Sequence, residues 1–200
     1  TSLILEEVET MEHFFMGLDA GVRFFQGNLF AKPGSGFLDP RFGYKLIEKG
    51  LQNYIDHKTK QQLNIAKVAN NMNILIKQKL AIDKVSIEIN DVGALMVKLT
   101  ALAPESWSRI YVCNRWGYQV TPNFTNSNQN GWQQEPKYIG RNWCWRPYFF
   151  RRAAEAWHNG RGILSQPYID LETRQIMWTF VFPLTQELFL FIDLNQIVET

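Results

Sequence analysis

The sequence predicts an α+β protein in which a strand–helix–strand unit and long helices precede an antiparallel sheet. Three observations lead to this prediction. One strand–helix–strand pattern fills residues 1–36, helix-forming residues dominate residues 37–82, and residues 83–200 hold short strand-like segments around a short helix. We therefore expect three regions with these boundaries.

The N-terminal region has the pattern of a single crossover between two parallel strands. Residues 2–5 form a short apolar run, residues 11–22 place apolar side chains at helical spacing, and residues 22–30 form a second apolar run. Gly21 suits the end of the helix, and the Pro-Gly pair at 33–34 ends the second strand. Parallel strands are buried on both faces, so either another part of the fold supplies the neighbouring strands or the chain is a fragment of a larger protein; we favour the fragment.

Residues 39–80 are expected to be helical. Asp39 suits the N-cap and Pro40 the first turn, and apolar residues form a stripe on either side of a polar segment at 57–62. That segment is either an exposed turn of one long helix or a break between two helices. A helix of about forty residues would be unusually long, so it either serves as a linker or dimer seam or packs on its own domain.

The following residues introduce the predicted sheet. Residues 82–102 have helical spacing and end before Pro104, although their first half alternates as in a strand at Val85, Ile87 and Ile89. Residues 109–113 and 118–121 predict a hairpin that turns at Gly117. Residues 123–136 are rich in Asn, Gln and Ser and predict a surface loop.

The C-terminal third completes the sheet. Residues 148–158 predict a short helix that ends near Gly160, and residues 162–170, 175–182 and 187–194 predict three further strands. Two strands, a helix and three strands form an antiparallel sheet with helices on one side. This is a PAS-like arrangement.

Composition excludes several classes of protein. A net charge of +2 is too small to indicate binding to nucleic acid or to an anionic membrane surface. No apolar stretch approaches the roughly 18 residues that a transmembrane helix needs, so we expect a soluble, cytoplasmic protein. Cys113 and Cys144 have no metal-ligand spacing around them and are expected to be inert, buried thiols.

One segment has the composition of a small-molecule pocket. Residues 140–150 combine tryptophans, arginines, a tyrosine and phenylalanines, and Tyr168 and Asp170 follow at i and i+2. Aromatic walls give affinity, guanidinium groups orient a ligand, and i and i+2 side chains of a strand share a face. The alternative is structural: Trp143, Trp145 and Tyr148 pack in the core, and Arg146 forms a buried ion pair with Asp170.

Residues 5–10 and 21–33 resemble the closing segment of EAL-type cyclic-diguanylate phosphodiesterases, which are TIM-like barrels. The family pattern there is Glu-Gly-Val-Glu-Thr, then Gln-Gly-aromatic, then Pro. The resemblance implies that Glu6 is the late glutamate beside the metal-activated water and that Gln26 lies near the bound dinucleotide. Glu7 departs from the pattern where Gly is usual, and Asn28 replaces the aromatic residue.

The same resemblance implies that the complete barrel uses a divalent metal, Mg or Mn, and binds cyclic diguanylate. Glu6 would serve the metal only in a complete barrel. The namesake Glu-Ala-Leu motif and the paired aspartates do not occur in these 200 residues. Because two-metal hydrolysis needs several carboxylates, we expect this chain alone to hold no cofactor and to be inactive, while the parent protein is a phosphodiesterase.

Residues 42–194 resemble the PAS-like, Cache-type domain that follows the barrel in certain EAL proteins, through segments 109–113, 142–149, 168–173 and 189–194. More distantly, an Arg-Pro-Tyr motif, a Tyr-x-Asp motif and a later Asp resemble the Cache motifs that hold an amino acid. The ligand-binding residues implied in this chain are Trp145, Arg146, Tyr148, Tyr168, Asp170 and Asp193. Phe149 stands where a tyrosine is usual.

The leading prediction is therefore a regulatory domain of a cyclic-diguanylate signalling protein that senses an unknown small molecule and forms a homodimer. The first alternative is that the chain is part of an active phosphodiesterase whose main catalytic residues lie upstream. The second is a purely structural dimerisation module. Neither nucleic acid nor a membrane is an expected partner.

Overall fold

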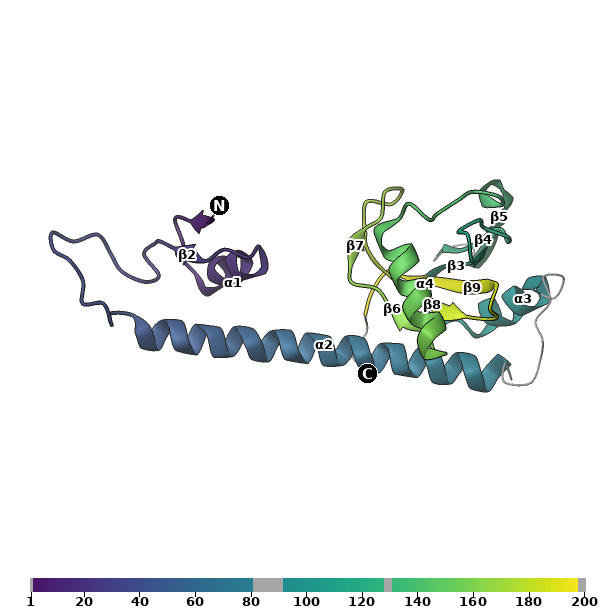
Figure 1. The fold of residues 1–200 in the computed structure, drawn as a ribbon, viewed down its shortest axis with the longest axis horizontal. Helices are drawn as coiled ribbons and strands as arrows, with labels where there is room; N and C mark the ends of the chain where they lie inside the picture. Colours follow the sequence, from purple (N-terminus) through teal and green to yellow (C-terminus); the bar gives the residue numbers. More distant parts are fainter. Residues whose placement is uncertain (1, 81–91, 128–130, 198–200) are drawn as a thin grey trace. The chain divides into compact units, whose positions relative to one another are not determined.

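The computed structural model describes residues 2–80, 92–127 and 131–197. The chain divides into two compact units, Thr1–Gln62 and Leu63–Thr200. A single helix, α2 (Tyr44–Leu80), contributes to both of them (Figure 1).

The first unit contains the predicted strand–helix–strand crossover. Strands β1 (Ile4–Leu5) and β2 (Phe24–Phe25) are parallel, and helix α1 (Met11–Asp19) connects them. Thr10 caps α1, because its hydroxyl accepts a hydrogen bond from the amide of His13 at 3.2 Å. The second strand is shorter than predicted, since the chain turns after Gln26 and the amide of Phe30 bonds to the carbonyl of Gly27.

The crossover buries only one side of its apolar surface. Phe14 of α1 is buried, and its ring lies edge-on to Phe25 at 4.8 Å between centroids. In contrast, Leu3, Ile4 and Phe24 are 57%, 62% and 48% exposed. The described part of this unit thus provides neighbours for one face of its two strands and leaves the other face open.

Helix α2 begins later than predicted and is continuous. The backbone of Gly43 has a φ of +76°, which ends the preceding turn, and the Asp39 carboxylate accepts from the amide of Arg41 at 2.7 Å within that turn. The polar segment 57–62 lies inside the helix, so the one-helix alternative is correct. Asp19 joins this part of α2 to α1 by accepting from the Tyr54 hydroxyl and from Lys58 Nζ, both at 2.7 Å.

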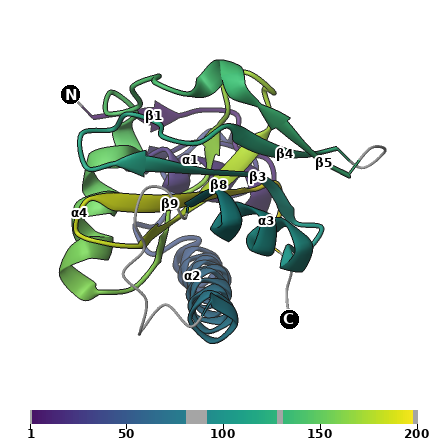
Figure 2. The ribbon, with the colours of Figure 1, turned by 90° about the vertical axis from the view of Figure 1, so that its right-hand side faces the viewer.

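The second unit is an antiparallel sheet of seven strands with the order β5-β4-β3-β9-β8-β6, and β7 also pairs with β8 (Figures 1 and 2). This confirms the predicted α+β class. The strands are β3 (Trp107–Asn114), β4 (Asn123–Ser127), β5 (Gly131–Glu135), β6 (Ile163–Leu164), β7 (Tyr168–Ile169), β8 (Ile176–Pro183) and β9 (Leu188–Leu194). In addition to part of α2, this unit contains the helices α3 (Val92–Leu102) and α4 (Pro147–Asn159) and a short 3-10 helix at Pro136–Tyr138.

Helices cover both faces of this sheet, so the prediction of helices on one side was wrong. Alternate residues of β3, β8 and β9 divide between two apolar clusters. One cluster includes Ile110 and Ile192 together with residues of α2 and α3, and Figure 2 shows these two helices on the same side of the strands. The other includes Tyr111, Phe191 and Phe149 of α4. The ring of Phe191 stacks with those of Tyr111 and Phe149, with centroids 5.2 and 5.0 Å apart.

Residues 123–136 are not the predicted surface loop. They contain β4 and β5, which pair from Asn123 opposite Glu135 to Ser127 opposite Gly131. The turn at Gly117 is confirmed, since its amide bonds to the carbonyl of Asn114 at 3.0 Å. The predicted return strand at 118–121 forms only two isolated bridges, and β4 pairs with β3 instead.

The remaining predictions had mixed outcomes. Helix α4 ends at Gly160 as expected, and segment 162–170 divides into β6 and β7. The strand-like alternation at Val85, Ile87 and Ile89 lies outside the described residues.

Cys113 is buried, and burial raises the pKa of its thiol. Cys144 is exposed, so its prediction as a buried thiol was wrong. No helix within the described ranges has both the length and the apolar character that crossing a membrane requires.

Candidate ligand-binding site

Glu6 and Gln26 lie at the same end of the two parallel strands. Each follows its strand directly, and the amide of Gln26 bonds to the carbonyl of Leu5 at 2.9 Å. Both residues are exposed. Among residues 2–80, 92–127 and 131–197, no three His, Cys, Asp or Glu side chains form a group that could hold a metal ion.

The backbone around these residues explains the glycines of the motif. Glu7 has a φ of +57°, in the left-handed region where glycine is favoured, so the departure at this position places strain in the chain. At Gly27, a Cβ atom would overlap the backbone of Val8. Glycine is therefore required at 27, because the segment after β2 passes directly against the segment after β1.

Arg109 is the centre of a buried polar cluster in the second unit. It lies on β3, and the strand register places it opposite Asp193 on β9. Its Nε is 2.9 Å from Oδ2 of Asp193, and its Nη2 is 3.2 Å from Oδ1 of Asp170. Glu172 lies at the exposed side of the same guanidinium, 3.5 Å from Nη1.

The other oxygens of the two aspartates are also hydrogen-bonded. Oδ2 of Asp170 accepts from the amide and the hydroxyl of Thr173 at 2.9 and 3.1 Å. Oδ1 of Asp193 accepts from the Thr179 hydroxyl at 2.7 Å, and that hydroxyl is 2.8 Å from the Tyr168 hydroxyl. Both carboxylates are therefore saturated by groups of this chain.

Burial and charge act in opposite directions on these groups. For Asp170, burial alone would raise the pKa, but hydrogen bonds from Thr173 and the charge of Arg109 outweigh it and lower the pKa. For Asp193, complete burial dominates and raises the pKa, although Arg109 and Thr179 oppose that shift. Burial would lower the pKa of Arg109, but the neighbouring carboxylates reverse that effect and keep the guanidinium charged.

Arg146 is held by aromatic rings rather than by a carboxylate. The residue is 8% exposed and occupies the N-cap position of α4. Its guanidinium carbon lies 4.9 Å from the ring centroid of Trp145 and 5.4 Å from that of Trp143. Its Nε is buried and has no hydrogen-bond acceptor in the part of the chain that the structure describes. Arg109 forms the ion pair with Asp170, so the alternative of an Arg146–Asp170 ion pair was wrong.

An open pocket of about 400 Å³ lies beside Arg146. It is lined by Trp145, Arg146, Arg151, Arg152, Gln166, Pro167, Tyr168, Ile169 and Leu171. The structure thus brings three of the predicted ligand residues, Trp145, Arg146 and Tyr168, to one pocket. Asp170 and Asp193 belong to the Arg109 cluster instead and do not line it. The side chain of Tyr148 lies outside what the structure describes.

Sequence reasoning missed Arg109 as the partner of both aspartates. Only the pairing of β3 with β9 brings Arg109 opposite Asp193, and this pairing is not visible in a local pattern. Arg151 and Arg152 were also missed as lining residues. Their position in the first turns of a helix that begins at the pocket is the signal that could have found them.

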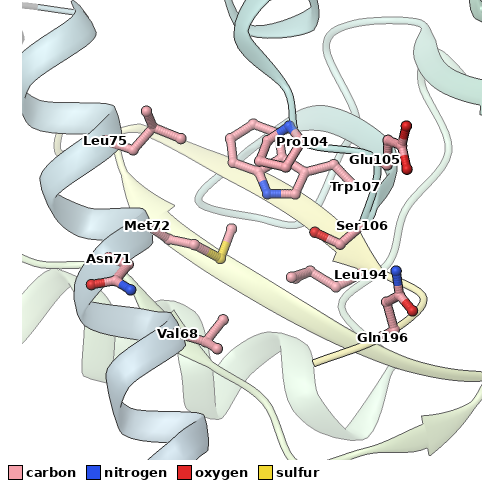
Figure 3. A pocket seen from close by; sticks show the side chains of 10 residues that line it. All are labelled: Val68, Asn71, Met72, Leu75, Pro104, Glu105, Ser106, Trp107, Leu194 and Gln196. Atoms are coloured by element: carbon pink, nitrogen blue, oxygen red, sulfur yellow. The ribbon is translucent and has the colours of Figure 1, made fainter. Parts of the chain in front are cut away.

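Two further cavities occur in the second unit. One of about 600 Å³ is polar and includes Arg109, Glu135, Tyr138 and Glu172. The other, of about 700 Å³, is mainly apolar; Figure 3 shows Met72 and Leu75 of α2 facing Trp107 and Leu194 across it. Among the described residues, neither lining includes a residue with an unpartnered buried polar atom, whereas the lining of the pocket beside Arg146 includes Arg146.

The second unit is thus an α+β domain in which helices cover both faces of an antiparallel sheet and an open pocket lies at the start of α4. Residues 38–197 match the model of the EAL-domain associated signalling protein domain, and the chain belongs to this family. The chain is also 27% identical over 196 residues to the EAL-domain containing protein YkuI of Bacillus subtilis, covering 96% of this chain. It spans about half of that protein, 47% of its length.

The crystal structure of the same Bacillus subtilis protein agrees with this family. The crystal structure of Bacillus subtilis YkuI, with an EAL domain and in complex with c-di-GMP and calcium, matches with a TM-score of 0.81 and 27% identity. That match covers 97% of this chain and 48% of YkuI. The ligand-binding domain of the Campylobacter jejuni chemoreceptor Tlp3, in complex with L-valine, gives a TM-score of 0.44 at 14% identity, over 80% of this chain and 65% of that one.

Proposed function

We propose that the second unit is the ligand-sensing, regulatory domain of an EAL protein in cyclic-diguanylate signalling. The observation that carries this proposal is the buried Arg146, which lines an open pocket and whose Nε has no hydrogen-bond acceptor among the described residues. A buried polar atom without a partner costs stability, on the order of 1–3 kcal/mol, so its retention indicates that a ligand completes it. Membership of a signalling-domain family supports the regulatory role.

A path for the signal leads from the pocket to α2. Helix α4 begins at the pocket and ends at Gly160, two residues before the buried Gly162. The side chain of Asn73 on α2 donates to the carbonyl of Gly162 at 2.9 Å and accepts from its amide at 2.6 Å. A ligand that shifts α4 would therefore change the position or stability of α2, which is a coupling between two sites.

The whole protein is proposed to bind and hydrolyse cyclic diguanylate with a divalent metal in its barrel. YkuI, which was crystallised with c-di-GMP and calcium, supports this. Glu6 and Gln26 would contribute one carboxylate and one amide from the ends of β1 and β2. Two-metal hydrolysis needs more carboxylates than these described residues supply, so we expect no turnover by this chain alone.

A thermal-shift screen tests the sensing function. A compound that binds only the folded state must raise the unfolding midpoint, by an amount that grows with its concentration. We expect at least one member of a broad metabolite set to raise the midpoint of the wild-type chain and to have no effect on Arg146→Ala. A set that leaves the wild type unchanged throughout would contradict a sensing function.

Dimerisation is a second proposed function, and one observation favours it. Tyr44, Ile47, Leu51 and Ile55 of α2 are 66%, 37%, 38% and 58% exposed, and their spacing places them in one stripe. The occupant that suits such a stripe is the same helix of a second copy. Sedimentation velocity should give a dimer for the wild type and a monomer for Leu51→Glu; equal masses would exclude this stripe as the seam.

A further inference from the structure

The aspartates of the Cache-like motif are not available to a ligand. This matters because, in the motif that the sequence resembles, the carboxylate would hold the amine of an amino acid. Asp170 and Asp193 are each 1% exposed, and Arg109 bridges them at 3.2 and 2.9 Å. A ligand amine would have to displace both Arg109 and the donors Thr173 and Thr179. Breaking a buried ion pair in this way is costly.

The pocket that remains is basic. Of the described residues, its lining contains Arg146, Arg151 and Arg152 and no aspartate or glutamate. Arg152 forms an ion pair with Glu155 at 2.7 Å, which leaves the buried Arg146 and the exposed Arg151 for a ligand. The pocket also lies at the N-terminal end of the 13-residue helix α4, where the helix dipole favours negative charge.

The rest of the lining is apolar and partly aromatic. Trp145 is 58% exposed, although its ring is fixed against Arg146 on one side. Ile169 and Leu171 are 63% and 54% exposed and lie in the same lining. An exposed tryptophan beside two apolar side chains suits the flat or apolar body of a ligand rather than a second charge.

We infer that the ligand of this pocket is an organic anion, a carboxylate or a phosphate ester with an aromatic or apolar body, and not an α-amino acid or an amine. The anionic group bonds to the guanidinium of Arg146, and the body lies against Trp145. A volume of about 400 Å³ admits a molecule of this size. This inference rests on the proposed sensing function and specifies the chemistry of the same site.

Four probes that share one ring and differ in charge test it by calorimetric titration. Phenylacetate and phenyl phosphate carry the two anionic groups, phenethylamine carries a cation, and L-phenylalanine carries both charges. We expect one or both anions to bind and the amine and the amino acid not to bind. The stronger of the two anions identifies the ligand as a carboxylate or as a phosphate ester.

Three variants locate the binding. Arg146→Gln should weaken the bound anion by about tenfold or more, because a charge-assisted hydrogen bond is lost. Trp145→Ala, at an exposed position, keeps the test valid if Arg146→Gln folds poorly, and it should weaken the same anion. Arg161→Gln is the matched control, since Arg161 is exposed and lies beyond the far end of α4, and it should leave the affinity unchanged.

The outcomes separate this inference from the function on which it rests. Binding of phenylalanine or phenethylamine that depends on Asp170 would overturn the anion inference while sensing by the domain would stand. If none of the four probes binds, the anion inference fails, and the metabolite screen alone then decides the sensing function. Anion binding that is equally strong in Arg146→Gln, Trp145→Ala and Arg161→Gln would place the site elsewhere and also overturn the inference.

Discussion

The Nε of Arg109 lies 2.9 Å from Oδ2 of Asp193, directly across the pair of central strands β3 and β9. This contact joins two positions that are far apart in the sequence and fixes the charged centre of the second unit. Because the same guanidinium also holds Asp170, the segment after β7 is attached to the middle of the sheet. The ligand pocket is built against that segment, so Arg109 supports the pocket without lining it.

Replacing Arg109 should destabilise the second unit severely. Arg109→Met leaves two buried carboxylates without their cation, and breaking a buried pair in this way costs about 3–5 kcal/mol. Urea unfolding followed by tryptophan fluorescence measures the loss. All seven tryptophans lie at positions 107–178, so the signal reports on this unit alone.

Arg115→Gln is the matched control for that experiment. Arg115 pairs with Glu187 at 3.0 Å, but the two side chains are 55% and 50% exposed. An exposed pair of this kind contributes about 0–1 kcal/mol. Similar losses for Arg109→Met and Arg115→Gln would show that the buried cluster carries no special share of the stability.

The stability contributed by Asp170 should depend on pH. Its pKa is lowered in the folded state, so the contribution is fully present above the unfolded pKa of about 3.9 and is lost as the pH falls through the folded value. The difference in unfolding free energy between the wild type and Asp170→Asn should therefore be largest near neutral pH and shrink below about pH 4. Urea titrations from acid to neutral pH measure it, and a difference that stays constant over this range would contradict the assigned direction.

Asn73 should contribute more to the free energy of unfolding than any exposed asparagine of α2. It satisfies both backbone groups of Gly162, which is buried, so Asn73→Ala leaves a donor and an acceptor without partners. We expect a loss of about 2 kcal/mol or more in the unfolding free energy. Asn70→Ala, at an exposed position three residues earlier, should cost nothing, because alanine is the better helix former.

Gly27 should tolerate no side chain. A Cβ at this position overlaps the backbone of Val8. The backbone shift that removes such an overlap destabilises the fold by about 1–3 kcal/mol. Gly34→Ala is the control, since nothing lies within 4 Å of a Cβ there. Hydrogen exchange in α1 reports on the first unit, and we expect it to accelerate in Gly27→Ala but not in Gly34→Ala.

The elements that the sequence predicted well are those with a local signal. Helical spacing marked α1, the turn at Gly117 marked the end of β3, and alternation or apolar runs marked β8 and β9. Strands β4 and β5 were missed because asparagines and glutamines dominate them and only a few side chains, such as Phe124, point into the core. Their pairing depends on the neighbouring β3, which composition does not reveal.

The site divides in the same way. Trp145, Arg146 and Tyr168 were found because an aromatic and basic motif is visible over a few residues. The roles of Asp170 and Asp193 were not, because they depend on which arginine reaches them. Two arginines compete for that role, and only the strand register shows that Arg109 has it.

Hydrogen–deuterium exchange tests the sensing function most directly. It is measured with and without a ligand, which is whichever of phenylacetate and phenyl phosphate binds more tightly. In the wild type we predict slower exchange in α4 and also in α2 around Asn73, because the two helices are joined through Gly162. In Asn73→Ala the ligand should still slow exchange in α4 but no longer in α2. Binding that leaves the exchange of α2 unchanged in the wild type would contradict a role for this domain in passing a ligand signal along that helix.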